Sequence, residues 1–423
     1  MTETVKNRGW TVTFAGTGIN LALGILYTWS IFQAAIKKSI ETGGEGAFAW
    51  DMSSISDPYA VCCLVFAFSM IVAGKVQDKF GPRVTAFIGG VLVGLGLLLT
   101  SQSNTYIAWV LGFGVLAGAG IGFGYSAATP PALKWFPGGK TGLIAGLVVA
   151  GFGLAPVYIA PLASYLVAHF GLQQAMMFFG AAFFVVVGVL STFLTNPPPG
   201  YVPVDPNPEH VKTKIVTSHA VDVPTREVIR SANFWKLWAL FFIGSGAGLM
   251  VIGSVAGMAK ASMGEAAFVA VAIMAVGNAS GRIIAGVVSD AIGRSVALAI
   301  FTGLQALNMV LAIFVVGTSG AAALMIVLSA TFIGFNYGTN LALFPAFAKT
   351  WWGLKSFGVN YGFLMTAWGI GGFVMTRVNS MLVAKSGGYT YSFIVAGVLL
   401  TISAVVALTL KAPAPKETDK PAA

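Results

Sequence analysis

Charged residues are scarce in this chain. Asp, Glu, Lys and Arg make up 9% of its 423 residues, whereas about a quarter is usual for a soluble domain. Asp and Glu together number only 14, hydrophobic residues reach 57%, and the mean hydropathy is +0.83. These values exclude a disordered chain, a coiled coil and a water-soluble enzyme of ordinary composition. They indicate a protein that lies mostly in lipid.

The residues that build disulfides, metal sites and catalytic centres are also few. The two cysteines, Cys62 and Cys63, are adjacent, and adjacent cysteines rarely form a bridge. The three histidines are scattered, and neither a P-loop nor a nucleophile with a base partner occurs. We therefore expect no metal, no cofactor and no enzymatic activity. The net charge of +10 could suggest nucleic acid, but in a membrane protein it more often reflects orientation, so no nucleic-acid partner is expected.

Long apolar runs are what the sequence has in abundance. A helix needs about 20 apolar residues to cross the hydrocarbon core of a bilayer. Twelve runs reach this length, at about 11–34, 57–77, 84–102, 106–134, 141–168, 174–195, 234–257, 265–287, 295–317, 321–346, 356–382 and 390–410. The stretch 196–233, which opens with three prolines, divides them six and six. We expect an N-terminal half at 1–195, a cytoplasmic linker at 196–233, and a C-terminal half with a short tail at 234–423.

The distribution of Lys and Arg predicts the orientation of these spans. With both termini in the cytoplasm, eighteen of the 24 Lys and Arg residues lie on the cytoplasmic side and four lie outside. The other two, Arg282 and Arg377, lie within spans. The opposite orientation would reverse this ratio, against the positive-inside rule. We therefore expect a multi-pass membrane protein with both termini in the cytoplasm.

A short motif occurs twice, at equivalent positions of the two sets of six runs. The pattern G-x3-D-x2-G begins at Gly74 and again at Gly286, each time in a short cytoplasmic loop, and we call the step between these two glycines the repeat offset. The Asp of the motif can cap a helix, and its glycines permit a tight turn. The residues to which we assign a loop or gating role are Asp78, Arg83, Asp290 and Arg294. The pattern resembles the loop signature of the major facilitator superfamily, which implies two six-helix halves around a central cavity. The expected fold is all-α, with twelve transmembrane helices.

Charged residues inside a span are costly and are therefore candidates for function. Arg282 lies in the eighth run, with Asn278 one turn earlier on the same face. A guanidinium can hold a carboxylate through two parallel hydrogen bonds. Because no acidic residue occurs mid-span to pair with Arg282, we expect it to bind an anion rather than to be structural. Arg377 is nearer the external end of the eleventh run, where a structural or gating role is expected.

Aromatic and amide residues are expected to complete the site. Tyr125 and Tyr337 are separated by the repeat offset, so they are equivalent in the two halves, and Tyr27 adds a third hydroxyl. Further candidates for the wall of the site are Asn340, Phe152, Leu364 and Trp368. Aromatic residues within spans are more often packing residues than ligand contacts, so both interpretations stay open for these positions.

Several segments resemble the monocarboxylate transporter family and its bacterial oxalate/formate-exchanger relatives. They are GILYTW at 24–29, LKWFP at 133–137, NFW at 233–235 and the pair Asn278-x3-Arg282. The resemblance covers the whole chain and implies a bacterial lactate/proton symporter in the cytoplasmic membrane. It also implies carboxylate binding at Arg282, with Tyr27 and Tyr125 as pocket residues.

The chain departs from these relatives at several positions. It has no Lys or Arg between Arg8 and Lys37, where animal members carry a lysine, and Asn278 stands where they have an aspartate. Both differences leave the proton relay unassigned. Trp368 stands where oxalate exchangers have a second cation, which argues against a dicarboxylate, and Tyr337 stands where they have a tryptophan.

The expected function is proton-coupled transport of a short monocarboxylate, with L-lactate as the first candidate. The expected partners are this substrate, a proton and membrane lipids, and a monomer can form the whole pathway. Asp57 and Glu265, at external ends of spans, are the candidates for proton coupling, although each can simply cap a helix start. A proton carried by the substrate is the third option. Electroneutral exchange of organic anions and a membrane sensor that binds a carboxylate without moving it are the alternatives.

Overall fold

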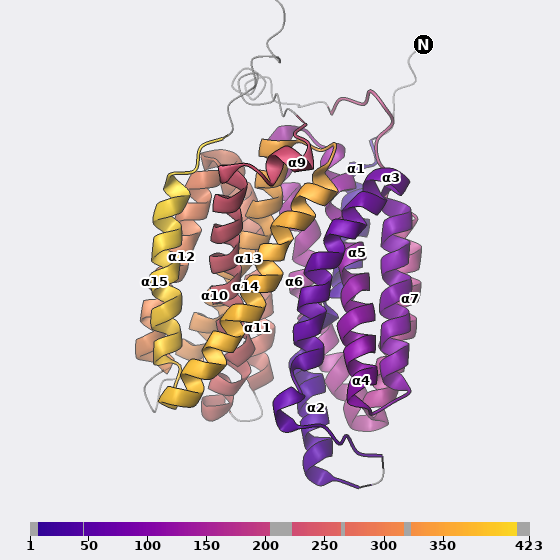
Figure 1. The fold of residues 1–423 in the computed structure, drawn as a ribbon, viewed down its shortest axis with the longest axis vertical. Helices are drawn as coiled ribbons and strands as arrows, with labels where there is room; N and C mark the ends of the chain where they lie inside the picture. The colour runs from indigo at the N-terminus through magenta and orange to yellow at the C-terminus, as the bar shows by residue number, and fades with distance from the viewer. Residues whose placement is uncertain (1–6, 45, 204–221, 264–266, 317–322, 413–423) are drawn as a thin grey trace, which may run out of the picture.

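The computed structural model describes residues 7–44, 46–203, 222–263, 267–316 and 323–412. Nearly all of these residues are helical, and none of them is in a strand. In lipid, only a helix or a closed barrel satisfies every backbone N–H and C=O group, and the long apolar runs therefore fold as helices. The helices form two groups side by side, with α1–α7 in one and α10–α15 in the other (Figure 1). The expected all-α architecture is confirmed.

The first half begins with a span that is interrupted. A 3-10 segment, η1 (Gly24–Thr28), separates α1 (Gly9–Leu23) from α2 (Trp29–Thr42), so the expected continuous run at 11–34 is both broken and longer. The other elements of this half are η2 (Met52–Ser54), α3 (Asp57–Ser101), α4 (Tyr106–Trp109), the π-helical η3 (Val110–Ala117), α5 (Gly118–Lys134), η4 (Gly138–Lys140), α6 (Thr141–Phe170) and α7 (Leu172–Ser191).

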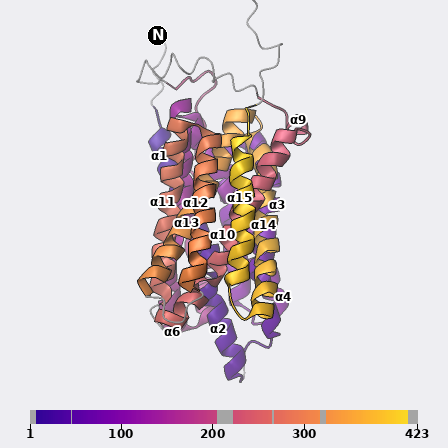
Figure 2. The same ribbon diagram turned by 90° about the vertical axis from the view of Figure 1, so that its left-hand side faces the viewer.

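The second half follows a short helix, α9 (Thr225–Val228). Its helices are α10 (Ala232–Met263), α11 (Ala267–Ile292), α12 (Arg294–Val316), α13 (Ala323–Trp352), α14 (Phe357–Ser386) and α15 (Thr390–Leu408). Figure 2 looks onto this half and shows its helices running along one common direction. We call the end of the bundle where α1 begins and α15 ends the terminal end, and the end where α2 finishes the far end (Figure 1).

Ten helical segments of the described chain are long and apolar enough to cross a membrane. One of them, α3, contains two expected spans, because it bends at Gly81 between 57–77 and 84–102. Helix α14, with 30 residues, supplies the remaining expected span. Large apolar side chains are exposed on the outer surface of the bundle, as expected for a lipid-facing protein; examples are Phe14, Leu95, Val185, Phe314 and Val405.

The repeated motif forms a similar turn in both halves. Gly81 and Gly293 have φ angles of 82° and 92°, a left-handed conformation that glycine adopts without strain. The expected role of these glycines in tight turns is confirmed. In the first copy, Nε of Arg83 donates a hydrogen bond of 3.1 Å to the carbonyl of Leu194, which fixes the turn to the end of the sixth span.

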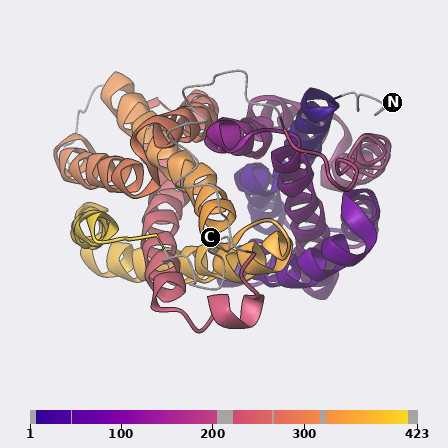
Figure 3. The ribbon, with the colours of Figure 1, turned by 90° about the horizontal axis from the view of Figure 1, so that it is seen from above.

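The two halves meet mainly through α3 and α6 of the first half. Helix α3 packs against α14, and α6 packs against α11 and α13. Seen from the terminal end in Figure 3, the indigo-to-magenta helices of the first half and the orange-to-yellow helices of the second half lie side by side. The candidate site lies at these contacts.

Candidate functional site

Arg282 is fully buried in α11 at the contact with α6. Its Nε donates to Oδ1 of Asn278, one turn earlier, at 3.0 Å. Its Nη1 donates to the carbonyl oxygen of Val149 in α6, so the side chain links the second half to the first. Both partners are uncharged, and the positive charge is therefore not neutralised by either contact.

The remaining nitrogen of the guanidinium has no acceptor at hydrogen-bonding distance among the described residues, although the Tyr27 hydroxyl lies near the guanidinium. Nη2 of Arg282 is buried and makes no hydrogen bond within the described part of the chain. The ion pairs found among the described residues do not include Arg282. A buried donor without an acceptor costs about 1–3 kcal/mol, and a buried charge without a counter-charge costs several more. An anion bound at Nη2 would supply both the acceptor and the counter-charge.

Four tyrosines from four segments lie within electrostatic reach of Arg282. They are Tyr27 in η1, Tyr125 in α5, Tyr337 in α13 and Tyr361 in α14. The hydroxyls of Tyr27 and Tyr337 are 2.7 Å apart and share a hydrogen bond across the two halves. Nε1 of Trp368 donates to the same Tyr337 hydroxyl at 2.7 Å. All three tyrosines predicted from the sequence are therefore brought to Arg282.

Tyr361 was not predicted. Its hydroxyl lies beside that of Tyr125, but neither hydroxyl has a partner at hydrogen-bonding distance and angle among the described residues. These two hydroxyls, one from each half, therefore retain hydrogen-bonding capacity next to the guanidinium. Helical spacing could have identified Tyr361 as a site residue. It is one turn before Leu364 and two turns before Trp368, both of which were predicted, so the three lie on one face of the helix.

The rest of the site is an aromatic wall. The ring of Phe152 lies 5.0 Å from that of Tyr27 and 5.4 Å from that of Tyr125, measured between centroids. Phe66 in α3, also missed by the sequence analysis, lies 5.0 Å from Trp368 and 6.0 Å from Phe152. These rings bury the polar atoms of the site in apolar surroundings, where electrostatic interactions are stronger than in water.

The other two predicted wall residues are Asn340 and Leu364. Nδ2 of Asn340 donates to the carbonyl of Asn336 at 3.1 Å, and its Oδ1 lies close to Gly244 in α10. The structure therefore places Asn340 between α13 and α10. Leu364 is fully buried in the hydrophobic core that includes Phe152 and Trp368.

The repeat makes the site polar on one side and apolar on the other. Moving back along the chain by the repeat offset from Asn278 and Arg282 leads to Phe66 and Met70 in α3. The helix equivalent to α11 thus presents a ring and a thioether where α11 presents an amide and a guanidinium. Such a site suits a ligand with one charged end and one apolar end.

At the far end, Arg377 and Asp57 pair with each other. Nη2 of Arg377 in α14 lies 3.6 Å from Oδ1 of Asp57 at the start of α3, and Tyr106 donates to Oδ2 of Asp57 at 2.9 Å. The two side chains are 62% and 27% exposed, so the pair contributes about 0–1 kcal/mol. Arg377 and Tyr106 therefore pair both carboxylate oxygens of Asp57 without a ligand. Glu265 lies outside the described residues.

At the terminal end, the halves touch backbone to backbone. A Cβ atom added to Gly74 would lie 2.3 Å from the backbone of Gly358, and one added to Gly142 would lie 2.2 Å from the carbonyl oxygen of Gly286. No side chain fits at either contact. Gly74 and Gly286 each begin a copy of the repeated motif, and each contacts a glycine of the other half. The terminal end is closed in this conformation.

Asp290 reinforces this closure. Its carboxylate accepts hydrogen bonds from the N–H groups of Gly142, at 2.9 and 3.1 Å, and Leu143, at 3.1 Å, at the start of α6. The first N–H groups of a helix have no partner within the helix, so Asp290 caps α6 from the other half. Nη2 of Arg294 lies 2.6 Å from Oδ1 of Asp290 and balances its charge. The expectation that the motif aspartate can cap a helix is confirmed for this copy.

The corresponding cap in the second half comes from the segment before α9. The N–H groups of Leu354 and Lys355, which the repeat offset relates to those that Asp290 caps, donate to Oδ1 of Asp222 at 3.0 and 2.9 Å. Asp78 is the motif equivalent of Asp290, yet Asp222 accepts these two bonds. Asp222, in the segment that connects the halves, therefore contributes to the closed terminal end.

The chain is similar to known proteins along almost its whole length. A model of the family described as Major Facilitator Superfamily matches residues 9–328 and 250–423. The uncharacterized MFS-type transporter YhjX of Escherichia coli (strain K12) is 28% identical over 379 residues, 88% of this chain and 88% of that protein. The oxalate:formate antiporter of Oxalobacter formigenes is 28% identical over 370 residues, 86% of this chain and 82% of that protein. Monocarboxylate transporter 13 of Bos taurus is 24% identical over 411 residues, 95% of this chain and 89% of its own.

Proposed function

Because the chain belongs to the major facilitator superfamily, we propose that it carries a short-chain monocarboxylate across the bacterial cytoplasmic membrane by alternating access, with the terminal end in the cytoplasm. Arg282 binds the carboxylate. The observation that carries this proposal is the buried Nη2 atom of Arg282, which has neither an acceptor nor a counter-charge among the described residues. The names of two relatives, an oxalate:formate antiporter and a monocarboxylate transporter, agree with an organic anion as substrate.

The polar and apolar groups of the site favour one carboxylate on a short carbon chain. One oxygen accepts from Nη2 of Arg282, and the hydroxyls of Tyr125 and Tyr361 remain free to donate to the carboxylate. The carbon chain lies against Phe66 and Phe152. A second carboxylate would have no cation beside it among the described residues of the site. Trp368 stands where oxalate exchangers have their second cation, and its Nε1 donates to the hydroxyl of Tyr337.

Transport requires the contacts between the halves to change. In the conformation described, the terminal end is closed by its two glycine contacts and by the Asp290 cap. Opening this end to the cytoplasm separates these groups, whereas the pair of Arg377 with Asp57 at the far end is already 3.6 Å apart in this conformation. The residues assigned to this gating are Asp78, Arg83, Asp290, Arg294 and Arg377.

The proposed substrate is L-lactate, moved together with a proton. A neutral complex of guanidinium and carboxylate avoids carrying a bare charge through the closed state. Asp57 is the described candidate for the proton, and a proton on the substrate is the alternative. Anion exchange is the second candidate function. It is favoured by the lack of any carboxylate paired with Arg282 in the described part of the chain, because no acidic group beside the bound anion is then present to carry a proton with it.

Uptake of radiolabelled L-lactate by proteoliposomes tests this proposal. Symport predicts accumulation above the external concentration when the lumen is alkaline, and loss of accumulation when a protonophore collapses the gradient. Exchange predicts uptake that ignores the gradient but rises when the lumen contains lactate or formate. Uptake no faster than in protein-free vesicles, for lactate, pyruvate, acetate, propionate, oxalate and formate alike, would refute the proposed carrier function.

Replacing Tyr361 with phenylalanine is expected to weaken substrate binding. The change removes one hydroxyl beside Arg282 and keeps the ring, so the loss of a hydrogen bond to a charged group predicts a KM for lactate raised about 10-fold. The measurement is the initial rate of uptake against concentration. Tyr391→Phe is the matched control, because Tyr391 in α15 is 57% exposed on the outer surface. An unchanged KM for Tyr361→Phe would remove this residue from the site.

A further inference from the structure

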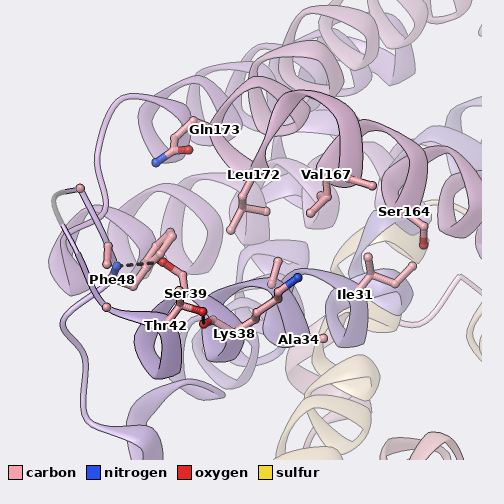
Figure 4. A pocket seen from close by; sticks show the side chains of 15 residues that line it. Ile31, Ala34, Lys38, Ser39, Thr42, Phe48, Ser164, Val167, Leu172 and Gln173 are labelled. Atoms are coloured by element: carbon pink, nitrogen blue, oxygen red, sulfur yellow. Dashed lines mark hydrogen bonds between the residues drawn. The ribbon is translucent and has the colours of Figure 1, made fainter. Parts of the chain in front are cut away.

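A cavity lies at the far end of the molecule, within the first half. It has a volume of about 670 Å³ and lies between α2, the loop that follows it, the end of α6 and the start of α7 (Figure 4). Its apolar wall includes Ile31, Val167 and Leu172, and its polar wall includes Ser39, Thr42 and Gln173. None of the residues named for the Arg282 site lines it, so it is a separate space.

One cation faces this cavity. The side chain of Lys38 lines it, and in Figure 4 its amine extends over the space between Ile31 and Leu172. The neighbouring Lys37 does not line the cavity, and its Nζ lies 3.7 Å from Oε1 of Glu41. The described lining residues include no Asp or Glu, and the ion pairs of the described chain do not include Lys38. The cavity therefore presents a positive charge that no described carboxylate neutralises.

The other polar groups leave room for an anion. The hydroxyl of Thr42 donates to the carbonyl of Lys38 at 2.8 Å, and the hydroxyl of Ser39 accepts from the N–H of Phe48 at 3.2 Å. The Ser39 hydroxyl can therefore still donate its own proton to a ligand. The ammonium and the hydroxyl suit the carboxylate of a short aliphatic acid, and the apolar wall of the cavity suits its carbon chain.

One face of a single span carries residues of both the cavity and the Arg282 site. Lys38, Ala34, Ile31 and Tyr27 are spaced by three or four residues, which places them along one side of α2 and the end of η1. Eleven residues of helix correspond to roughly 16 Å. Tyr27 at the inner end belongs to the Arg282 site. This face thus leads from Lys38 to the Arg282 site.

We infer that the cavity is an outer binding site for the transported carboxylate, in which Lys38 captures the anion from the external solution before it reaches Arg282. This inference rests on the proposed function and adds a second binding step to it. Capture by an isolated cation raises the local concentration of the anion and speeds its entry, and it depends on ionic strength.

Cysteine labelling tests the outer site without relying on transport. Ala34 lines the cavity and is exposed, whereas Cys62 and Cys63 are buried and should not react. In Ala34→Cys protein, the anionic reagent 2-sulfonatoethyl methanethiosulfonate should react about 10-fold faster with Lys38 present than after Lys38→Ala. L-lactate should slow this reaction, and it should still do so when Arg282 is also replaced by alanine. Lys37→Ala is the matched control and should leave both results unchanged.

The outcomes separate the two proposals. A labelling rate that Lys38→Ala does not change, or the absence of protection by lactate, would overturn the outer site even if uptake through Arg282 is intact. If phosphatidylglycerol in the vesicles slows the labelling of the Ala34→Cys protein and lactate does not, the ligand is a lipid headgroup and the inference is wrong. In uptake assays, Lys38→Ala should raise the KM for external lactate several-fold and leave the maximal rate unchanged, and Lys38→Arg should restore it.

Discussion

Replacing Arg282 with alanine is expected to abolish lactate transport while the protein still folds and inserts. Removing one partner of a buried, hydrogen-bonded charge pair costs about 2–5 kcal/mol, which corresponds to roughly a 30- to 4000-fold loss of affinity. The folded protein should tolerate the change, because the guanidinium in the empty site is a buried charge without a counter-charge among the described residues. The measurement is the initial rate of uptake, corrected for the amount of monodisperse protein in the vesicles.

Two further variants make this result specific. Arg282→Lys keeps the charge but cannot bond Asn278, Val149 and a carboxylate in the same geometry, so it should recover only part of the activity. Arg377→Ala is the matched comparison. It also removes an arginine from a span, but the side chain is exposed and its ion pair is weak, so uptake should fall by a few-fold at most. Rates for Arg282→Ala within a few-fold of the unmodified protein would show that the carboxylate binds elsewhere.

Replacing Gly142 with alanine is expected to block the cycle at the terminal end. The new Cβ would lie 2.2 Å from the carbonyl oxygen of Gly286, so the backbones must separate. Overpacking of this kind costs about 1–3 kcal/mol, which lowers the population of the closed terminal end by roughly 5- to 150-fold. Uptake should fall accordingly, whereas equilibrium binding of lactate at Arg282 should persist. Gly286→Ala places its Cβ 2.2 Å from the carbonyl oxygen of Gly142 and should behave in the same way.

The control for this prediction is a glycine inside one half. A Cβ added to Gly303 in α12 would have no neighbour closer than 3.9 Å, so Gly303→Ala should leave uptake near normal. Accessibility gives a second measurement. A cysteine introduced on the cytoplasmic side of the site should react faster with a thiol reagent in Gly142→Ala than in the unmodified protein. Normal uptake by Gly142→Ala would mean that this contact does not form during transport.

Most of the fold could be predicted from the sequence because lipid leaves few choices to the backbone. Apolar length identified the helices, and the repeated motif at Gly74 and Gly286 related the two halves. The breaks within helices were less predictable. The 3-10 segment η1 (Gly24–Thr28) and the π-helical segment η3 (Val110–Ala117) have the composition of ordinary spans. Tertiary packing rather than local propensity decides where such segments form, so the sequence did not predict them.

The site was predictable where the residue type itself carried the signal. A lone arginine within a span indicated the charge, and the repeat paired Tyr125 with Tyr337. Contacts made by backbone atoms gave no such signal. The carbonyl of Val149 that holds Arg282 could belong to any residue, since every residue has one. Asp222 likewise could not be identified as a helix cap, because its partners are two N–H groups far along the chain.

Counterflow tests the central claim most directly, because it needs a carrier but no ion gradient. Proteoliposomes are loaded with unlabelled L-lactate and diluted into a trace of labelled L-lactate, with equal pH and no potential across the membrane. The account predicts a transient accumulation of label above equilibrium for the unmodified protein and none for Arg282→Ala at equal protein content. Equal accumulation by both proteins, or none by either with any of the short carboxylates, would contradict it.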